Sequence, residues 1–444
     1  MNSDSRKKVM YVRDPVLGSI RLSPLQEDLL KTVEVQRLSF IHQLGTTFQS
    51  YPGAHCMRLS HALGVSSLAG RIGRAVMPGT AGSDAGIDLL EAAGMLHDIG
   101  HTPWSHTLEP LFLELSGIDH MDLVEGLICG SARMGIPGSG RIPGILESHG
   151  IDPADVAALI RSGYRGPRYL QQIIFGEVDA DMLDYLQRDF HFTGVAYGHI
   201  EVDRIISTMA VAGSELVFQD KALDAVRDFL LARLQMYSSV YLHKKTRIVD
   251  QMLLRAARRS IVDLREIECF HEQTDDEILS FLVKGSRDPW VRDMAWRVKY
   301  RQNLFTQVFR IDAARRSGDE ERFLEQLRGL GGTARQAAAR LEADIASRAG
   351  APPGSILVDL PLEAVKVSEE RFEKVDIRFL TGSGRLVTLS EIDPPFARYL
   401  SDAKPNRNLL SVSCSPELGQ TVASACGKVL EEAAIPLFKG MGLD

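Results

Sequence analysis

Hydrophobic side chains recur every three to four residues along most of this chain, from position 24 to about position 345. That spacing puts the apolar side chains on one face of a helix and the polar side chains on the other. Clusters of Gly, Pro and Ser interrupt the rhythm, as they do between helices. The pattern predicts long amphipathic helices over residues 58–76, 88–98, 171–190, 222–258 and 320–346.

Two other stretches alternate between apolar and polar residues, which is typical of strands. Residues 11–22 (YVRDPVLGSIRL) alternate on both sides of a Pro and a Gly and predict a short hairpin or an extended arm. After the APPG segment at 351–354, short alternating runs surround a TGSG turn, and a last helix is predicted at 418–433. The short runs cover residues 356–360, 375–380 and 385–389.

These patterns predict a mainly α protein. Residues 1–23 would form an N-terminal arm, residues 24–345 a large all-helical core, and residues 351–444 a smaller α+β region. The composition is that of a folded globular protein, because 44% of the 444 residues are hydrophobic and 25% are charged. A disordered chain is therefore excluded.

The charge balance and the cysteines narrow the possible partners. Lys and Arg number 51 against 58 Asp and Glu, and the net charge of −7 argues against a surface that coats nucleic acid. No run of about 18 apolar residues occurs, so no membrane span is expected. The five cysteines are scattered and form no CxxC pair, which is typical of a reduced cytoplasmic protein.

Histidines next to acidic residues are the strongest chemical signal. His97 shares a helical face with Leu90 and Ala93, so it should point into the protein, directly before Asp98. A buried imidazole beside a carboxylate costs free energy unless both groups find partners, and one metal ion would serve both. Any single histidine here is more often a satisfied core residue. Four of the twelve histidines nevertheless fall within one short stretch: His61, His97, His101 and His106.

A third segment adds acidic groups on a helix. Asp181, Tyr185 and Asp189 are spaced four residues apart and would form one stripe along it. Asp184 and Arg188 have the same spacing and are expected simply to pair with each other. Two imidazoles and two carboxylates would make a mixed nitrogen and oxygen site, which suits Mn, Fe, Mg, Zn or Ni.

The order His, His-Asp, Asp (His61, His97-Asp98, Asp181) resembles the HD-domain metal phosphohydrolases. The flanking sequence resembles their deoxynucleotide triphosphohydrolase branch, which includes the eukaryotic sterile-alpha-motif/HD enzyme. The resemblance is close over about residues 11–260. The matching segments are DPVLGSIRL (14–22), EVQRLSFIHQLG (34–45), YPGAHCMRLSHALGV (51–65), GMLHDIGHTPWSH (94–106), DADMLDYLQRDFHFTGV (179–195) and YLHKKTR (241–247).

This resemblance implies two groups of site residues. The first would bind one divalent metal ion, either Mn, Mg, Fe, Co, Ni or Zn. The second would act on the phosphates, with His101 and His106 facing them and His120 as a proton donor supported by Glu109. The family usually has Asp where this chain has Glu109. The implied metal ligands are His61, His97, Asp98 and Asp181.

The resemblance also implies contacts to a nucleotide. Arg58 would bind a phosphate, and Tyr185 and Asp189 would hold the sugar, with Gln43 and Leu44 near its 3′ side. Three residues of later helices would reach the phosphates or the base: Arg233, Tyr241 and Lys244.

The implied reaction is hydrolysis of a dNTP to deoxynucleoside and triphosphate by a homodimer or homotetramer. Two departures weaken parts of this expectation. Met182 stands where the family often has a phosphate-binding Lys, and Lys31 and Ser39 stand where the eukaryotic enzyme has its guanine-activator Asp and Arg. A phosphohydrolase for a nucleoside mono- or diphosphate, a cyclic dinucleotide or another signalling nucleotide stays open, as does a nucleotide sensor without turnover.

Overall fold

The computed structural model describes residues 9–77, 83–196, 200–261, 270–312, 334–360, 377–403 and 408–432. The chain divides into two compact units that interleave along the sequence. The first unit comprises residues 1–236, 262–280 and 375–399, and the second comprises residues 237–261, 281–374 and 400–444. The sequence had instead predicted consecutive segments, 1–23, 24–345 and 351–444.

The N-terminal segment folds as a hairpin, in line with its alternating pattern. Strand β1 (Tyr11–Asp14) pairs antiparallel with β2 (Gly18–Arg21). Helix α1 (Pro24–Leu30) follows directly. Its start is fixed by a capping box, in which Ser23 and Gln26 satisfy each other's backbone N–H groups. The hairpin and this helix thus form where the sequence predicted them.

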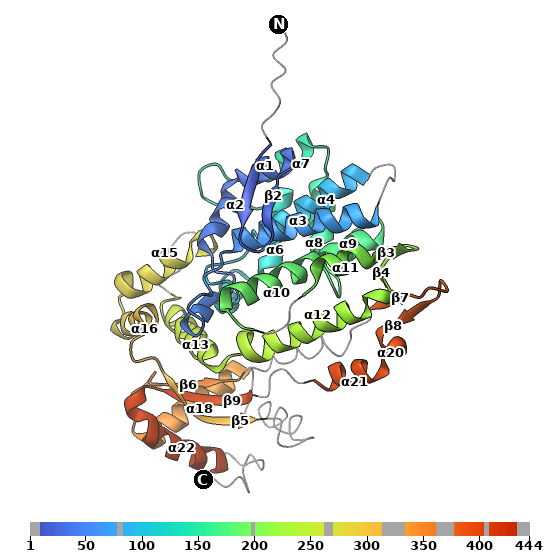
Figure 1. The fold of residues 1–444 in the computed structure, drawn as a ribbon. Coiled ribbons are helices and arrows are strands. Elements are labelled where there is room, and N and C mark those ends of the chain that lie inside the picture. The colour runs from blue at the N-terminus through green and yellow to red at the C-terminus, as the bar shows by residue number, and fades with distance from the viewer. Residues whose placement is uncertain are drawn as a thin grey trace. The chain divides into compact units, whose positions relative to one another are not determined.

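Three helices form the centre of the first unit. Helix α3 (Arg58–Val76) packs along α4 (Ser83–Leu96) and also against α10 (Ala180–Thr193), as Figure 1 shows. The α3–α4 contact includes a polar link, because the Ser66 hydroxyl donates to the backbone oxygen of Glu91 at 2.6 Å. The helix predicted over 171–190 is in fact two helices, since residues 175–179 turn between α9 (Arg168–Ile174) and α10.

Shorter helices surround this centre in the first unit (Figure 1). They are α2 (Val33–Arg37), α5 (Glu109–Ser116), α6 (His120–Cys129), α7 (Ile142–Ser148), α8 (Pro153–Arg161), α11 (Val202–Thr208), α12 (Leu223–Met236), α15 (Asp275–Ser280), α20 (Leu389–Ile392) and α21 (Pro394–Asp402), the last ending just beyond the unit's boundary.

A four-stranded sheet in the first unit runs in the order β3-β4-β7-β8. Strands β3 (Met209–Ala212) and β4 (Glu215–Gln219) lie within the region predicted to be wholly helical. Strand β4 pairs parallel with β7 (Arg378–Leu380), more than 150 residues away, and β7 pairs antiparallel with β8 (Leu386–Thr388). Periodicity did not reveal β3 and β4, because both are short apolar runs that do not alternate with polar residues.

The second unit combines helices with a three-stranded sheet of order β5-β9-β6. Its apolar core includes Ile345, Val358, Leu410, Val412 and Cys426. The helix predicted over 222–258 is divided, because a π-helical turn at Tyr237–Tyr241 separates α12 from α13. The elements of this unit are α13 (Lys244–Arg259), α16 (Pro289–Tyr300), β5 (Thr306–Asp312), α18 (Ala334–Ala349), β6 (Ile356–Asp359), β9 (Asn408–Cys414) and α22 (Gly419–Glu432).

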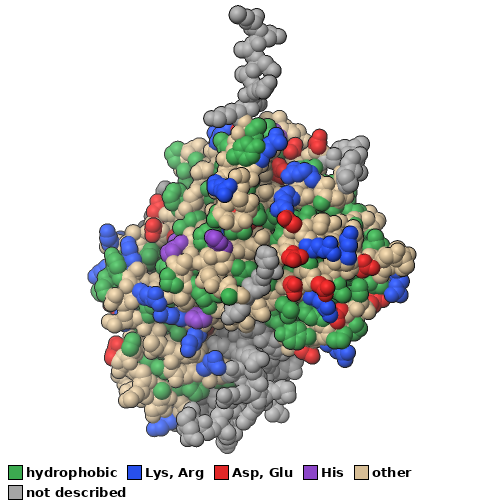
Figure 2. Space-filling view, in the orientation of Figure 1, with side chains coloured by type: hydrophobic (Ala, Val, Ile, Leu, Met, Phe, Trp, Pro, Cys, Tyr) green, Lys and Arg blue, Asp and Glu red, His purple; other side chains and the backbone are tan. Residues whose placement is uncertain are grey.

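The fold class is confirmed as mainly α with smaller sheets. The first part of the helix predicted over 320–346 and the start of the strand predicted over 375–380 lie outside the described residues. Within the described ranges, no helix combines the length and the apolar character needed to cross a bilayer. Figure 2 shows Lys, Arg, Asp and Glu side chains mixed over the face drawn, in keeping with the modest net charge.

Candidate metal centre

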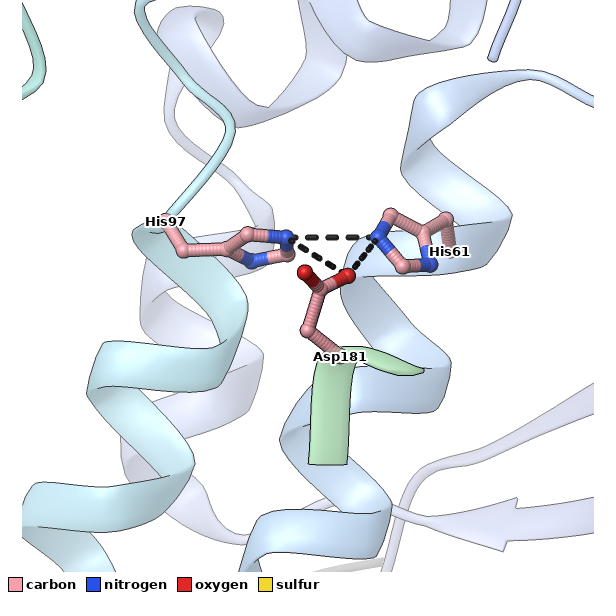
Figure 3. Close-up of side chains that lie close together, drawn as sticks. All are labelled: His61, His97 and Asp181. Carbon is pink, nitrogen blue, oxygen red and sulfur yellow. Dashed lines mark hydrogen bonds and ion pairs between the residues drawn. The ribbon is translucent and has the colours of Figure 1, made fainter. Parts of the chain in front are cut away.

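Four side chains that are far apart in the sequence meet at one point in the first unit. The His61 Nε2 atom, on α3, lies 3.0 Å from Asp181 Oδ1 of α10 and 3.3 Å from His97 Nε2 (Figure 3). Asp98 completes the group, with its Oδ1 atom 3.3 Å from His97 Nε2 and its Oδ2 atom 3.8 Å from His61 Nε2. The structure therefore brings together the four residues that the resemblance implied as metal ligands.

The partner of the Nδ1 atom in each imidazole determines which ring nitrogen carries the hydrogen. His61 Nδ1 lies 2.8 Å from a carboxylate oxygen of Asp184, and His97 Nδ1 lies 2.9 Å from the backbone oxygen of Gly94. Because both partners are acceptors, each Nδ1 carries the hydrogen and donates it. In its neutral form, each ring would present the lone pair of Nε2 to the centre, where a bound cation would take the place of any further proton. Lone pairs and carboxylate oxygens converging in this way form a donor set that suits a divalent metal ion.

The electrostatics of the centre agree with this donor set. Burial alone would lower the pKa of His61, but hydrogen bonds to Asp181 and Asp184 and their negative charges raise it to about 10. Burial alone would raise the pKa of Asp98, yet the positive charge of Arg58 holds it well below its usual range. The centre therefore concentrates negative charge in a largely buried place, which is the environment that a cation requires.

The turn after α4 allows the centre to form. Helix α4 ends at Leu96, and the two ligands His97 and Asp98 follow it directly. Gly100 then passes so close to α6 that an added Cβ would lie 2.3 Å from the backbone oxygen of His120. Only glycine fits this approach, and it brings His101 and His120 side by side.

A second cluster of three histidines and one carboxylate adjoins the centre. Glu109 accepts hydrogen bonds from Nδ1 of His106, at 2.7 Å, and from Nδ1 of His120. The His101 ring stacks on His120 with centroids 4.3 Å apart, and its Nε2 atom lies 3.3 Å from Asp98 Oδ1. Burial alone would raise the pKa of Glu109, but its two imidazole partners hold it well below the usual range.

A strained turn joins the two clusters. Trp104 and Ser105 both adopt left-handed backbone angles, with φ of 62° and 52°. Such conformations cost free energy in non-glycine residues and persist only where the surroundings enforce them. The buried Asp275 supplies that enforcement, because its carboxylate accepts from the Trp104 backbone N–H at 2.5 Å and its backbone oxygen accepts from the indole N–H at 3.0 Å. The Ser105 hydroxyl is thereby placed to accept from Arg58 Nε at 2.7 Å.

Comparison with known protein families finds matches to two consecutive regions of the chain. Residues 58–189 match the HD domain, and residues 200–434, more than half of the chain, match the HD associated region. The chain belongs to the HD-domain family. The HD domain spans α3 to α10 and contains all four residues of the centre, so the family expected from the sequence motifs is confirmed.

Curated relatives match the chain over part of their length. YwfO of Bacillus subtilis, an uncharacterized protein, is 36% identical over 258 residues, which is 58% of this chain and 56% of YwfO. The human deoxynucleoside triphosphate triphosphohydrolase SAMHD1 is 26% identical over 347 residues, which is 67% of this chain and 54% of SAMHD1. This HD-domain chain thus spans about half the length of the curated relatives it matches.

Solved structures share the fold over nearly the whole chain. A hypothetical protein from Aquifex aeolicus superposes with a TM-score of 0.70 at 24% identity, covering 94% of this chain and 99% of that one. A phosphohydrolase from Bacteroides thetaiotaomicron gives a TM-score of 0.66 at 23% identity, covering 91% and 99%. At these identities the likeness shows a common fold.

Of the residues expected to contact a nucleotide, Arg58 touches the HD centre, and four others lie on α10 or shortly before α3. Arg58 is buried against it and donates to Asp98 Oδ2 at 2.5 Å. Tyr185 and Asp189 follow Asp181 on α10, where the four-residue spacing puts them on one stripe. Gln43 and Leu44 precede the 3-10 turn at Gly45–Gln49.

The remaining expected contacts lie on later helices. Arg233, on α12, is buried, and its charge partly opposes the burial and the Asp181 charge that raise the pKa of Asp179, at the start of α10, to about 8. Tyr241 and Lys244 belong to the second unit. Their contacts with a nucleotide stay a prediction.

Sequence reasoning missed two residues that support the HD centre. Asp184 was expected only to pair with Arg188, but it also accepts the Nδ1 hydrogen of His61. Its position one helical turn after Asp181 was a usable signal, since both carboxylates then face the same neighbouring helix. Asp275 lies 170 residues beyond the turn that it holds, and nothing in the local pattern connects the two.

Proposed function

We propose that this protein is a metal-dependent phosphohydrolase that cleaves deoxynucleoside triphosphates to deoxynucleoside and triphosphate. The observation that carries the proposal is the convergence of His61, His97, Asp98 and Asp181 with their lone pairs directed at one point. Membership in the HD-domain family and the activity in the name of SAMHD1 support it. Assembly as a homodimer or homotetramer and a cytoplasmic location belong to the same proposal.

The ion held by these four residues would be Mn, Mg, Fe, Co, Ni or Zn. When bound, such an ion makes water a better nucleophile near neutral pH and neutralises charge on phosphoryl oxygens. Of the chain's own groups, Asp98 stays ionised because Arg58 donates to it. His101 is held neutral, since burial and the charge of Arg58 keep its pKa well below the usual value. A neutral His101 can donate its one hydrogen from Nε2, which lies 3.3 Å from Asp98 Oδ1, without adding positive charge beside the metal.

The proton for the leaving oxygen would come from His120. Its Nδ1 atom is held by the Glu109 carboxylate, which leaves Nε2 to carry and release a proton. The same carboxylate holds His106, so one acidic group orients two imidazoles. Glu109 therefore serves here in the place where the family usually has the shorter Asp.

Recognition of the substrate is the less defined part of the proposal. Tyr185 and Asp189 would hold the deoxyribose, with Gln43 and Leu44 near its 3′ side. Met182 is 7% exposed, so an apolar side chain is packed where a phosphate-binding lysine is expected. That observation favours a second candidate, the hydrolysis of another nucleotide phosphate. The intact metal-ligand and histidine clusters argue against a sensor without turnover, for which Met182 is the one supporting feature.

A substrate panel tests the proposal. The four dNTPs and four NTPs would be incubated with the protein and Mg²⁺, Mn²⁺, Co²⁺ or Ni²⁺, singly and in mixtures, and the products separated by chromatography. Deoxynucleoside plus triphosphate is the expected outcome. Monophosphate plus pyrophosphate would assign a different bond, hydrolysis confined to other nucleotides would support the second candidate, and the absence of product from every mixture would refute the enzyme.

A further inference from the structure

The carboxylate behind His61 belongs to a buried charge network that leads away from the metal centre. Asp184 is fully buried, and its Oδ2 atom accepts from His61 Nδ1 at 2.8 Å and from Arg188 Nε at 2.7 Å. Its Oδ1 atom accepts from the second guanidinium nitrogen of Arg188 at 2.8 Å. Asp184 therefore holds the imidazole on one side and the guanidinium on the other.

The network ends in the N-terminal hairpin. The remaining terminal nitrogen of Arg188 donates to Asp14 Oδ2 at 2.8 Å, and Asp14 is the last residue of β1. The other Asp14 oxygen accepts from the backbone N–H groups of Val16 and Leu17, at 2.9 and 2.8 Å, and so fixes the hairpin turn. A continuous series of hydrogen bonds thus joins that turn to Nδ1 of His61, on the opposite side of the ring from the metal-facing Nε2.

The packing of α3 is adapted to this network. An added Cβ at Gly64 would lie 1.8 Å from Asp184 Oδ1 and 2.6 Å from a guanidinium nitrogen of Arg188. Any larger residue would displace the pair from its place behind His61, which lies one turn earlier on the same helix. A glycine within a helix costs roughly 1 kcal/mol relative to alanine. The close fit at Gly64 gives that glycine a structural reason.

The charges of the network favour a cation at His61. One guanidinium is shared between the carboxylates of Asp14 and Asp184, so the network carries one excess negative charge. Without the Asp14 charge, Arg188 would be balanced by Asp184 alone, and Asp184 would attract the Nδ1 hydrogen of His61 less strongly. A weaker acceptor behind a ligating imidazole makes that imidazole a poorer metal ligand.

We infer that Asp184, Arg188 and Asp14 are positioning residues for His61, so that the N-terminal hairpin takes part in setting the metal affinity of the HD centre. This inference rests on the proposed metal centre and adds to it a dependence on residues that touch no substrate. It requires the loss of metal affinity on substitution to be larger at Asp184, which contacts His61, than at Asp14, which acts through Arg188.

The test is a titration of the full-length, metal-free protein with Mn²⁺ by calorimetry. Asp184→Asn should weaken Mn²⁺ binding by about 10–100-fold, the usual loss when an outer-shell partner is removed. Asp14→Asn should weaken it by a smaller factor. Asp28→Asn removes a half-exposed carboxylate of α1 and is the matched control, with binding unchanged. Circular dichroism would check that each variant is folded.

The outcomes separate this inference from the metal centre itself. If the wild-type protein binds no Mn²⁺, the proposed centre fails. If it binds Mn²⁺ and folded Asp14→Asn and Asp184→Asn variants bind as tightly, the positioning role fails while the centre stands. Should Asp184→Asn not fold, Asp14→Asn carries the test, and long-range ¹⁵N spectra of His61 add a readout. Those spectra should show Nδ1 protonated and strongly hydrogen-bonded in the wild type, with a weaker Nδ1 hydrogen bond in Asp14→Asn.

Discussion

The HD centre of the first unit and two ion pairs of the second unit bury charged groups in opposite ways. In the second unit, Arg255 donates two hydrogen bonds to Glu342, at 2.8 and 2.6 Å, and Arg247 donates two to Asp359, both at 2.8 Å. Each acid there has its own guanidinium. At the HD centre of the first unit, two carboxylates and two imidazole lone pairs face one another with Arg58 as their cationic donor.

The difference indicates which buried charges serve a reaction and which serve the fold. A carboxylate matched by a bidentate arginine is already satisfied and has little capacity left for a ligand. Buried hydrogen-bond acceptors that outnumber the donors around them cost free energy, and a bound cation would offset that cost. By this criterion we expect the HD centre to bind a cation, whereas the pairs on α13 are structural connections between α13, α18 and β6.

The contrast predicts its largest effect at His97. Replacing His97 with Ala removes one of the converging lone pairs, so metal binding and phosphate release should both be lost. The loss should exceed about 10³-fold, the upper figure for deleting one charge-stabilising donor from an active site. Metal content measured by mass spectrometry and product formation measured by chromatography would follow the change.

A matched control for that experiment is His149→Ala. His149 is also half-buried and also lies beside an aspartate, Asp28, at 3.2 Å, but within the described residues it forms an ion pair with that one acid alone. Metal content and activity should stay at the wild-type level. Equal losses in both variants would mean that histidine–carboxylate pairs in general, and not the convergence at the HD centre, govern the activity.

The sequence predicted this centre better than it predicted the fold around it. His61, His97, Asp98 and Asp181 stood out because each lies in a motif with a recognisable order. Periodicity and alternation also predicted α3 and the N-terminal hairpin. Contacts between distant segments could not be predicted, because neither the pairing of β4 with β7 nor the hold of Asp275 on Trp104 leaves a local pattern.

The next largest effect is expected at Glu109, in the histidine cluster beside the centre. Glu109→Gln would keep the shape of the side chain but remove the charge that orients His106 and His120. The rate of phosphate release should fall by about 10²–10⁴-fold, the usual contribution of a positioned general acid. Metal content should not change, which separates this variant from His97→Ala. A normal rate would show that His120 is not the proton donor.

The same variant has a predicted pH dependence of stability. The folded protein holds the pKa of Glu109 below the ordinary value of 4.5, so the carboxylate favours folding wherever it is ionised. That contribution is fully present above pH 4.5 and is lost as the pH falls into the range of the lowered pKa. Urea unfolding should therefore show the wild type more stable than Glu109→Gln near neutral pH, with the difference shrinking in acid. A constant difference would contradict the lowered pKa.

A smaller effect, on stability alone, is expected in the second unit. Glu342→Gln leaves the half-buried Arg255 without its ionised partner, and the free energy of unfolding should fall by about 1–3 kcal/mol. Because Glu342 and Asp359 each have their own arginine and no ligand role, Mn²⁺ affinity should remain that of the wild type. Urea unfolding and a metal titration of the same preparation would measure both quantities. A loss of Mn²⁺ affinity would remove the distinction between the two kinds of buried charge.

The smallest effect is expected on the outer face of α3, the helix that carries His61. Arg71 pairs with Asp203 of α11, but the two side chains are 38% and 91% exposed, so water screens their attraction. Arg71→Ala should change the free energy of unfolding by no more than about 1 kcal/mol and leave metal binding intact. This variant tests whether Mn²⁺ affinity depends on a residue's position on α3 or on the burial of its charge. If Arg71→Ala lowered Mn²⁺ affinity as strongly as Asp14→Asn, general loosening of α3 would explain both, and the excess of buried acceptors would not.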